Sequence, residues 1–381
     1  MDETGAALGL EAARALFPAT RQLAYLMNAA VAPIPSPVLD AIRNHLEEVS
    51  REGCLDFNRW MAVIRRCKER LSRLLGCPAA DLAFTKNTSQ GLQLAAASIP
   101  WKPGDNVVIN DLEFPANVFP WLQLERTRGV EVRTVRAREG RVTPEAIALA
   151  MDDRTRAVAV SWVQFSNGFR CDLEALSGLC EKRGAWLVID TVQGAGALAL
   201  DLSRLGPRTM AAGGCHKWLL TPVGVGYFRC PAGLLEELAP ANWGWLSMQD
   251  PFSMRREPVL RADAGRFEEG NLNVAAIVGL EASLELIERV GIGAIEARVL
   301  ALADRIVAGV RERGCQVLTP LGAAERSGIV LFRHPSRPAV ELVRDLMTQR
   351  VIAIDRDGAV RASPHFYNDE SDVDRLLAGL V

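Results

Sequence analysis

Two ionisable residues are candidates for chemistry because their neighbours in the sequence are apolar. Asp190 ends the apolar run 186–190, and Lys217 lies in the segment 213–218, among glycine, cysteine, histidine and tryptophan. A carboxylate at the end of a buried strand costs free energy unless a cation or a hydrogen-bond donor meets it. A desolvated lysine has the lowered pKa that a Schiff-base lysine requires. Taken singly, Asp190 could equally cap a helix, and Lys217 could be a buried structural lysine.

A pair of hydroxyl residues adds a candidate phosphate site. Thr88 and Ser89 precede the helix-like run 90–96, and a helix N-terminus with hydroxyl side chains binds phosphate well. Simple helix capping is the alternative. Pyridoxal 5′-phosphate (PLP) needs an amine for a Schiff base, a carboxylate to keep its pyridine nitrogen protonated, and amides and hydroxyls for its phosphate. Together the three features predict a PLP site.

The elements that must position these residues alternate along the chain. Strand-like apolar runs and helix-like segments follow one another at 59–75, 106–110, 130–135, 157–163, 173–183 and 186–190. Near-continuous apolar strands that alternate with helices predict an α/β fold with a mostly parallel, doubly wound sheet. Ligands gather at the carboxyl ends of such strands. Residues that follow different strands are therefore expected at one rim of the sheet.

The length of 381 residues favours two domains. Irregular, proline-containing sequence at 239–266 indicates a boundary, and the long helix expected over Val274–Val290 leads into a second α/β segment. We predict a large PLP-binding domain at 25–265. The smaller domain is predicted to combine 1–24 with 266–381.

Composition excludes several kinds of partner. A formal net charge of −2 gives no electrostatic reason to bind nucleic acid or an anionic membrane, and no apolar run is long enough to span a bilayer. The eight cysteines are scattered and there are four histidines, so we expect reduced thiols and no metal site. The acidic start, Met1-Asp2-Glu3, lacks the basic segment of a secretory signal. A cytoplasmic protein is expected.

Seven short motifs, in this order, resemble the class V aminotransferase family of fold-type I PLP enzymes. The branch that they resemble most holds group II cysteine desulfurases, selenocysteine lyases and isopenicillin N epimerases. The motifs extend over nearly the whole chain, at 25–30, 87–89, 113–117, 190–193, 216–217, 266–273 and 361–368.

The resemblance implies roles around the cofactor. Lys217 would form the Schiff base and then move the Cα proton, and Asp190 would pair with the protonated pyridine nitrogen. Gln193 would donate a hydrogen bond to the phenolic oxygen of the ring. The phosphate would be held by Thr88, Ser89 and His216. Gly214 stands where relatives often carry a phosphate-binding serine.

The resemblance also implies contacts with the substrate and with a second subunit. Phe114 occupies the place of a histidine that stacks on the cofactor, and keeps the stacking without acid–base chemistry. Arg361 would bind the α-carboxylate of an amino acid, for which a planar guanidinium is well suited, and Asn28 would border the substrate. Asn271 would reach the phosphate from the partner subunit of a homodimer, although the family form there is threonine.

The expected reaction is inferred from a cysteine that the sequence lacks. In group II desulfurases a loop before the carboxylate-binding arginine carries a cysteine that accepts sulfur, and the segment 350–361 has no cysteine. We therefore expect a C–S or C–Se β-lyase that acts on a cysteine-type amino acid without a persulfide relay. An aminotransferase or an epimerase is the alternative. A non-catalytic PLP-fold binding protein is less favoured because the catalytic set is complete, and a dehydrogenase because no GxGxxG motif follows a strand.

Overall fold

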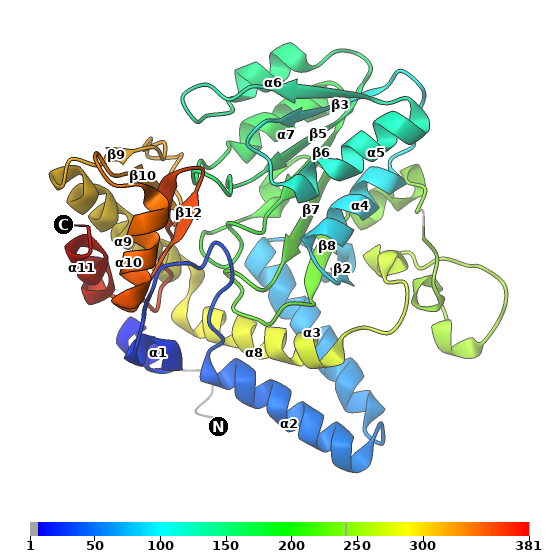
Figure 1. Cartoon of the computed structure of the whole chain (residues 1–381). Helices are drawn as coiled ribbons and strands as arrows, with labels where there is room; N and C mark the ends of the chain where they lie inside the picture. Colours follow the sequence, from blue (N-terminus) through cyan, green and yellow to red (C-terminus); the bar gives the residue numbers. More distant parts are fainter. Residues whose placement is uncertain (1–6, 241, 381) are drawn as a thin grey trace.

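The computed structural model describes residues 7–240 and 242–380, and within them a large sheet of seven strands forms the centre of the molecule (Figure 1). The order is β2-β8-β7-β6-β5-β3-β4. β8 is antiparallel to both of its neighbours, and all other pairs are parallel. The strands are β2 (Leu82–Thr85), β3 (Asn106–Asn110), β4 (Glu131–Val135), β5 (Thr155–Ser161), β6 (Trp186–Asp190), β7 (Thr209–Gly214) and β8 (Gly226–Arg229). The predicted α/β fold with a mostly parallel sheet is confirmed.

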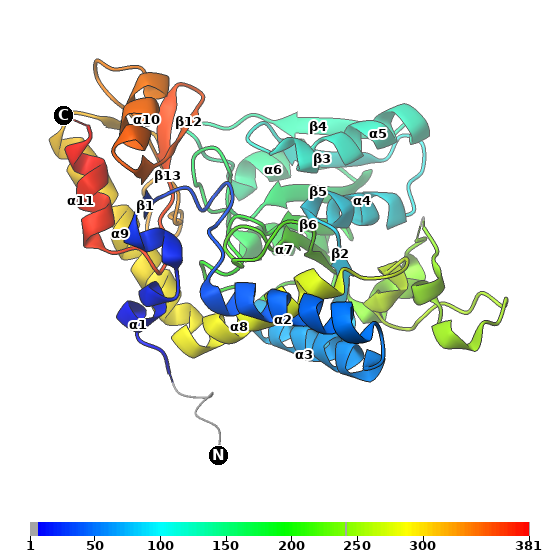
Figure 2. The same cartoon turned by 60° about the horizontal axis from the view of Figure 1, so that its bottom comes forward.

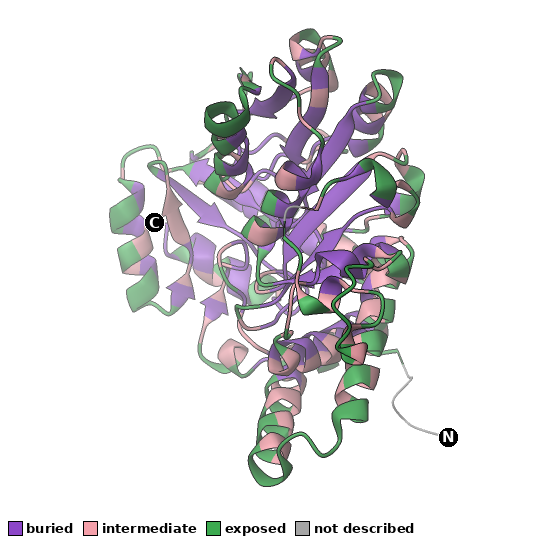
Figure 3. Ribbon diagram, turned by 90° about the vertical axis from the view of Figure 1, so that its right-hand side faces the viewer, coloured by how far each residue is buried: buried purple, intermediate pink, exposed green. Residues whose placement is uncertain are grey.

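Helices cover both faces of this sheet because its strands alternate their side chains between two hydrophobic clusters. On β6, Trp186 and Val188 join the cluster that contains residues of α4 and α5, whereas Leu187 and Ile189 join the cluster of α3, α7 and α8. Figure 3 shows the strands buried between exposed helical surfaces. The helices of this part are α2 (Ser36–Glu52), α3 (Phe57–Leu75), α4 (Thr88–Ser98), α5 (Phe119–Arg128), α6 (Pro144–Ala150), α7 (Leu173–Lys182) and α8 (Val274–Val290).

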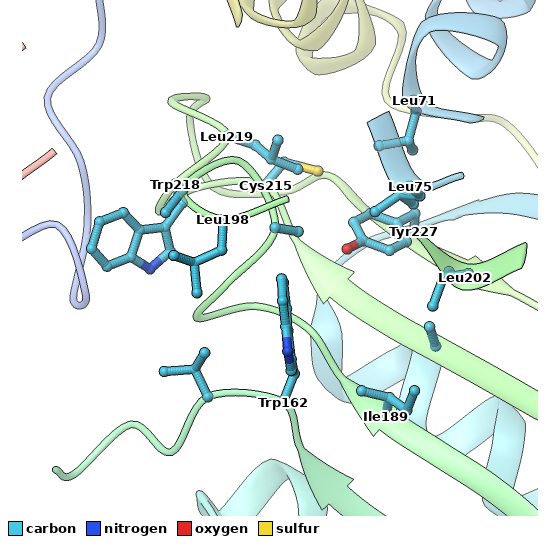
Figure 4. Packing of buried hydrophobic residues seen from close by; sticks show 14 of the residues in the cluster. Leu71, Leu75, Trp162, Ile189, Leu198, Leu202, Cys215, Trp218, Leu219 and Tyr227 are labelled. Carbon is cyan, nitrogen blue, oxygen red and sulfur yellow. The ribbon is translucent and has the colours of Figure 1, made fainter. Parts of the chain in front are cut away.

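The cluster that contains residues of α3, α7 and α8 also includes residues at the ends of β6 and β7 and in the loops that follow them. Figure 4 shows Trp218 and Cys215, from the loop after β7, packed near Trp162 and Leu198. Both tryptophans are almost fully buried. The loop that carries Lys217 is therefore held by buried side chains on both sides of the lysine, Cys215 before it and Trp218 after it.

A smaller sheet lies beside the large one (Figures 1 and 2). In the described chain it is antiparallel, in the order β12-β13-β10-β9. A separate parallel pair joins β1 to β11, which ties the N-terminal segment to the C-terminal part. These elements are β1 (Ala24–Tyr25), β9 (Gln316–Val317), β10 (Val330–Arg333), β11 (Val351–Ile352), β12 (Ile354–Arg356) and β13 (Ala359–Ala362), with helices α1 (Leu10–Ala15), α9 (Ile292–Glu312), α10 (Ala339–Thr348) and α11 (Glu370–Ala378).

The hydrophobic clusters divide the chain later than the predicted domain boundary at residue 266. Helix α8 packs along α2 and α3, so closely that a Cβ on Gly279 would lie 2.6 Å from Ile42 Cδ1. The cluster of the small sheet takes its first member after α8 at Leu302, within α9. The sequence shows that α8 is apolar, but not which core it joins. A boundary inside α9 agrees better with the packing.

Two further expectations concern a secretory signal and membrane-spanning helices. The acidic start Met1-Asp2-Glu3, which argued against a secretory signal, lies outside the described residues. Across 7–240 and 242–380, no helix has the length and apolar character needed to cross a membrane.

Candidate active site

A cavity of about 280 Å³ lies at the carboxyl ends of the strands of the large sheet. Residues after β2, β3, β5, β6 and β7 line it, together with Ala29 and Ala30 from the segment after β1 and with the β12–β13 hairpin of the small sheet. Most of the residues predicted from the sequence meet here: Thr88, Ser89, Phe114, Asp190, Gln193, His216, Lys217 and Arg361.

Asp190 occupies the end of β6 and is 3% exposed. One oxygen accepts a hydrogen bond from the Val192 backbone N–H at 2.9 Å, and the bonds found among the described residues give the other oxygen no protein donor. Burial raises the pKa of this carboxyl to about 7, although the Val192 bond and the Lys217 charge oppose the rise. Turns follow Asp190 and not a helix, so the helix-cap alternative fails.

Lys217 lies in the same cavity, in the loop after β7. Burial lowers the pKa of its ammonium to about 8; Asp190 opposes this, and Arg361 and Arg356 add to it. Within the described chain no direct ion pair joins Lys217 to Asp190, so each is free to meet a different end of a bound molecule. A lysine that loses its proton near neutral pH is suited to Schiff-base formation and proton transfer.

Gln193 is held in place by its neighbours. Its amide nitrogen, Nε2, donates to the Ala29 carbonyl at 3.0 Å, and its Oε1 accepts from Trp218 Nε1 at 3.1 Å. An amide nitrogen carries two protons, so one N–H remains for a ligand. This is consistent with the predicted bond to a phenolic oxygen, which stays a prediction.

The proposed phosphate site lies at the start of α4. Thr88 and Ser89 are the first residues of this helix, so their backbone N–H groups have no partner within it. Burial and the Lys217 charge lower the pKa of His216 to about 4, which leaves its ring neutral at pH 7. A Cβ on Gly214 would lie 2.9 Å from Thr88 Oγ1 and 3.1 Å from His216 Nδ1. The serine of relatives therefore does not fit here without displacing Thr88.

The ring of Phe114 borders the cavity and is 45% exposed. It packs edge-on against Phe165, with 5.1 Å between ring centroids, and Lys217 Nζ lies 5.9 Å from its centroid. The position suits stacking on a planar ligand. Neither phenylalanine can transfer a proton.

A cluster of polar groups behind Phe114 was not predicted from the sequence. The Glu113 carboxylate accepts hydrogen bonds from Asn110, Asn117, Gln164 and both the backbone and the hydroxyl of Ser161, at 2.5–2.9 Å. These donors come from two segments of the chain, 110–117 and 161–164. The cluster joins the ends of β3 and β5 and so fixes the loop that carries Phe114.

Two arginines of the β12–β13 hairpin face the cavity. Arg361 is 1% exposed, and its Nη1 donates to the Phe165 carbonyl at 2.5 Å. Burial and the nearby Arg356 charge lower its pKa to about 10. Arg356, which was not predicted, lies with its guanidinium carbon 5.2 Å from the Phe165 ring centroid. The sequence contains one signal for this position. Asp357-Gly358 is typical of a two-residue hairpin turn, and such a turn places the strand of Arg356 beside the strand of Arg361.

Two predicted residues do not line the cavity. Asn28 is fully buried; its Nδ2 donates to the Ser363 carbonyl and its Oδ1 accepts from Tyr367 Oη. It holds the adjacent loop against the small domain, and a contact with substrate stays a prediction. Asn271 is exposed and borders a different, smaller cavity. Its predicted reach into a partner subunit is likewise untested.

The residues present fit PLP. They offer an amine of lowered pKa, a buried carboxylate that is not paired with that amine, free helix N–H groups and a neutral histidine. These are the groups that the aldehyde, the pyridine nitrogen and the phosphate require. Across the described residues, no three histidine, cysteine, aspartate or glutamate side chains are grouped as metal ligands would be.

Comparison with known proteins agrees with the geometry. The family model "Aminotransferase class-V" matches residues 24–376. Isopenicillin N epimerase of Streptomyces clavuligerus is 30% identical over 369 residues, covering 91% of this chain and 92% of that protein. A cysteine desulfurase of Salmonella typhimurium is 29% identical over 407 residues, covering 98% and 97%. The structure of the cystine C–S lyase C-DES with its product cysteine persulfide has a TM-score of 0.88 at 22% identity, covering 96% and 98%.

The chain belongs to the class V aminotransferase family. It is a PLP-dependent enzyme, and the predicted family, fold type and cofactor are confirmed. The roles given to individual residues stay predictions.

Proposed function

We propose that this enzyme is a C–S or C–Se β-lyase that acts on a cysteine-type amino acid and has no persulfide-relay cysteine. The observation that carries the proposal is the β12–β13 hairpin. Asp357 and Gly358, with φ of 52° and 74°, form a two-residue turn between Arg356 and Ala359. Such a turn leaves no room for a mobile loop with a cysteine.

The positions of the cysteines in the described chain support the absence of a relay. None lines the cavity. Cys215 is two residues from Lys217, but it is fully buried, and burial raises its pKa. Cys54 is exposed, in the turn between α2 and α3. Relay chemistry needs an accessible thiolate that meets both the substrate and an acceptor.

The protein residues divide the work of the reaction. Arg361 would hold the substrate carboxylate, and Lys217, near its pKa, would remove the Cα proton. Bound PLP supplies a protonated ring that accepts negative charge from Cα. Ionised Asp190 keeps that ring nitrogen protonated. Lys217 could then protonate the leaving sulfur or selenium.

Epimerisation and transamination are the alternatives. Epimerisation needs a proton donor on the face opposite Lys217, and Phe114 and Phe165 offer none, which favours the lyase. Transamination, like β-elimination, needs proton transfer by Lys217 on one face of the substrate only. The products alone therefore distinguish these two reactions. The enzyme is further proposed to act in the cytoplasm as a homodimer, with no nucleic-acid or membrane partner.

Product analysis with L-cysteine and cysteine conjugates tests the function. The expected products are pyruvate, ammonia and free sulfide or thiol, with no sulfur added to the protein in its intact mass. Alanine as the product, with one added sulfur on a cysteine, would contradict the proposal and indicate a desulfurase. A keto acid that keeps the side chain of the amino donor, formed only when a second keto acid is present as the amino acceptor, would instead indicate an aminotransferase.

A further inference from the structure

The hairpin register places two guanidinium groups on one face. Arg361 is the cross-strand partner of Ile354, and residues paired across antiparallel strands share a face. Arg356 is two residues from Ile354 on the same strand, so it shares that face as well. Both arginines line the cavity and both contact Phe165, one at its carbonyl and the other at its ring.

The cavity holds more positive than negative charge. Among its described lining residues, Lys217, Arg356 and Arg361 are cationic, Asp190 is the carboxylate, and His216 is neutral at pH 7. No ion pair found in the described chain uses Arg356, and its buried Nε has no hydrogen-bond partner. Its neighbour Asp355 pairs with Val360 and so faces the other side of the hairpin. With Asp190 set against Lys217, Arg361 assigned to an α-carboxylate and the cofactor phosphate assigned to the start of α4, Arg356 is the lining cation that has no assigned anion.

We infer that Arg356 binds an anionic group on the side chain of the substrate, so that the enzyme prefers amino acids with a second negative charge beyond Cβ. The inference rests on the proposed function only in taking an amino acid as the ligand of this cavity. For a C–S lyase, the matching substrates are cysteine derivatives whose sulfur carries an acidic substituent, such as a carboxyalkyl thioether. A planar guanidinium binds a carboxylate through two parallel hydrogen bonds.

Binding of amino acids that lack a leaving group tests this without turnover. The PLP-loaded enzyme is titrated with L-aspartate, L-asparagine and L-alanine, and dissociation constants are read from the absorption change of the bound cofactor. We expect wild type to bind aspartate about tenfold or more tighter than asparagine, the effect of one charge-assisted hydrogen bond. Arg356→Gln should bring this ratio to about 1, mainly by weakening aspartate, and should change alanine binding much less.

Two matched variants separate recognition from structure. Arg356→Lys keeps the charge and should retain part of the preference for aspartate. Arg361→Lys should weaken all three ligands by a similar factor. The resting cofactor spectrum and the melting temperature of each variant show whether the site is intact.

The inference is overturned if wild type binds aspartate and asparagine equally. It is also overturned if Arg356→Gln weakens alanine as much as aspartate, because Arg356 would then serve the α-carboxylate or the fold. Failure of the lyase proposal is a separate outcome: a keto acid that keeps the substrate's side chain in place of pyruvate, with an intact, Arg356-dependent preference for aspartate, would replace the reaction and keep the specificity.

Discussion

The two charged walls of the cavity are built in different ways. Asp190 and Lys217 lie at the carboxyl ends of buried strands of the large sheet, one negative and one positive. Arg356 and Arg361 lie on a hairpin at the edge of the small sheet, with no carboxylate paired to either in the described chain. A pair of opposite charges that is fixed by the buried sheet suits a reaction that a whole family shares. A pair of like charges on an edge hairpin suits the selection of the substrate.

The largest expected effect is at Lys217. Lys217→Ala removes both the Schiff-base amine and the proton-transfer group, so turnover should fall by ~10²–10⁴-fold from the loss of acid–base catalysis alone. The absorption band of the covalently held cofactor should disappear, while added PLP still binds through the phosphate site. Lys182→Ala, at an exposed position on α7, is the control. If Lys217→Ala kept normal turnover, Lys217 would not be a catalytic group. The contrast between a catalytic wall on the large sheet and a substrate-binding wall on the hairpin would then no longer hold.

The wall on the large sheet could be predicted from the sequence for a physical reason. A charged residue that ends an apolar strand is recognisable from its neighbours alone, and the carboxyl ends of parallel strands meet at one rim. Asp190, Gln193 and Lys217 were found in this way or from the family motifs. The strand β6 itself was predicted with its observed bounds.

The hairpin wall was harder to predict. Arg356 precedes Asp357-Gly358, a sequence typical of an exposed turn, and its direction depends on strand register and on how the domains pack. Asn28 matched a family motif, yet its amide is satisfied by Ser363 and Tyr367. Contacts between segments more than 300 residues apart leave no local pattern in the sequence.

A smaller loss is expected for Asp190→Asn, which should still bind PLP. Loss of the charge that holds the pyridine proton should lower kcat by ~10²–10³-fold, as at other preorganised electrostatic sites. Near-normal kcat would show that Asp190 is not the partner of the ring nitrogen.

The same variant has a pH-dependent effect on the cofactor-free protein. The folded pKa of Asp190, about 7, lies above its ordinary value, so the folded state holds a proton that the unfolded state releases. This contribution to stability is present below the unfolded pKa and is lost as pH rises towards 7. Asp190→Asn should therefore gain in melting temperature relative to wild type between pH 4 and about 7. A constant difference across this range would contradict the raised pKa.

The smallest effect, and the sharpest separation of the two walls, is expected for Arg361→Lys. Lysine keeps the charge but cannot form two parallel hydrogen bonds with a carboxylate. KM should rise by about tenfold, the loss of one bond to a charged group, and kcat should change much less because Lys217 and Asp190 are untouched. The resting cofactor spectrum should stay the same. Arg333→Lys, an exposed arginine on β10 of the same sheet, should leave both constants unchanged. If Arg361→Lys altered kcat and the spectrum together, the hairpin would belong to the catalytic wall, and substrate choice would have to lie elsewhere in the cavity.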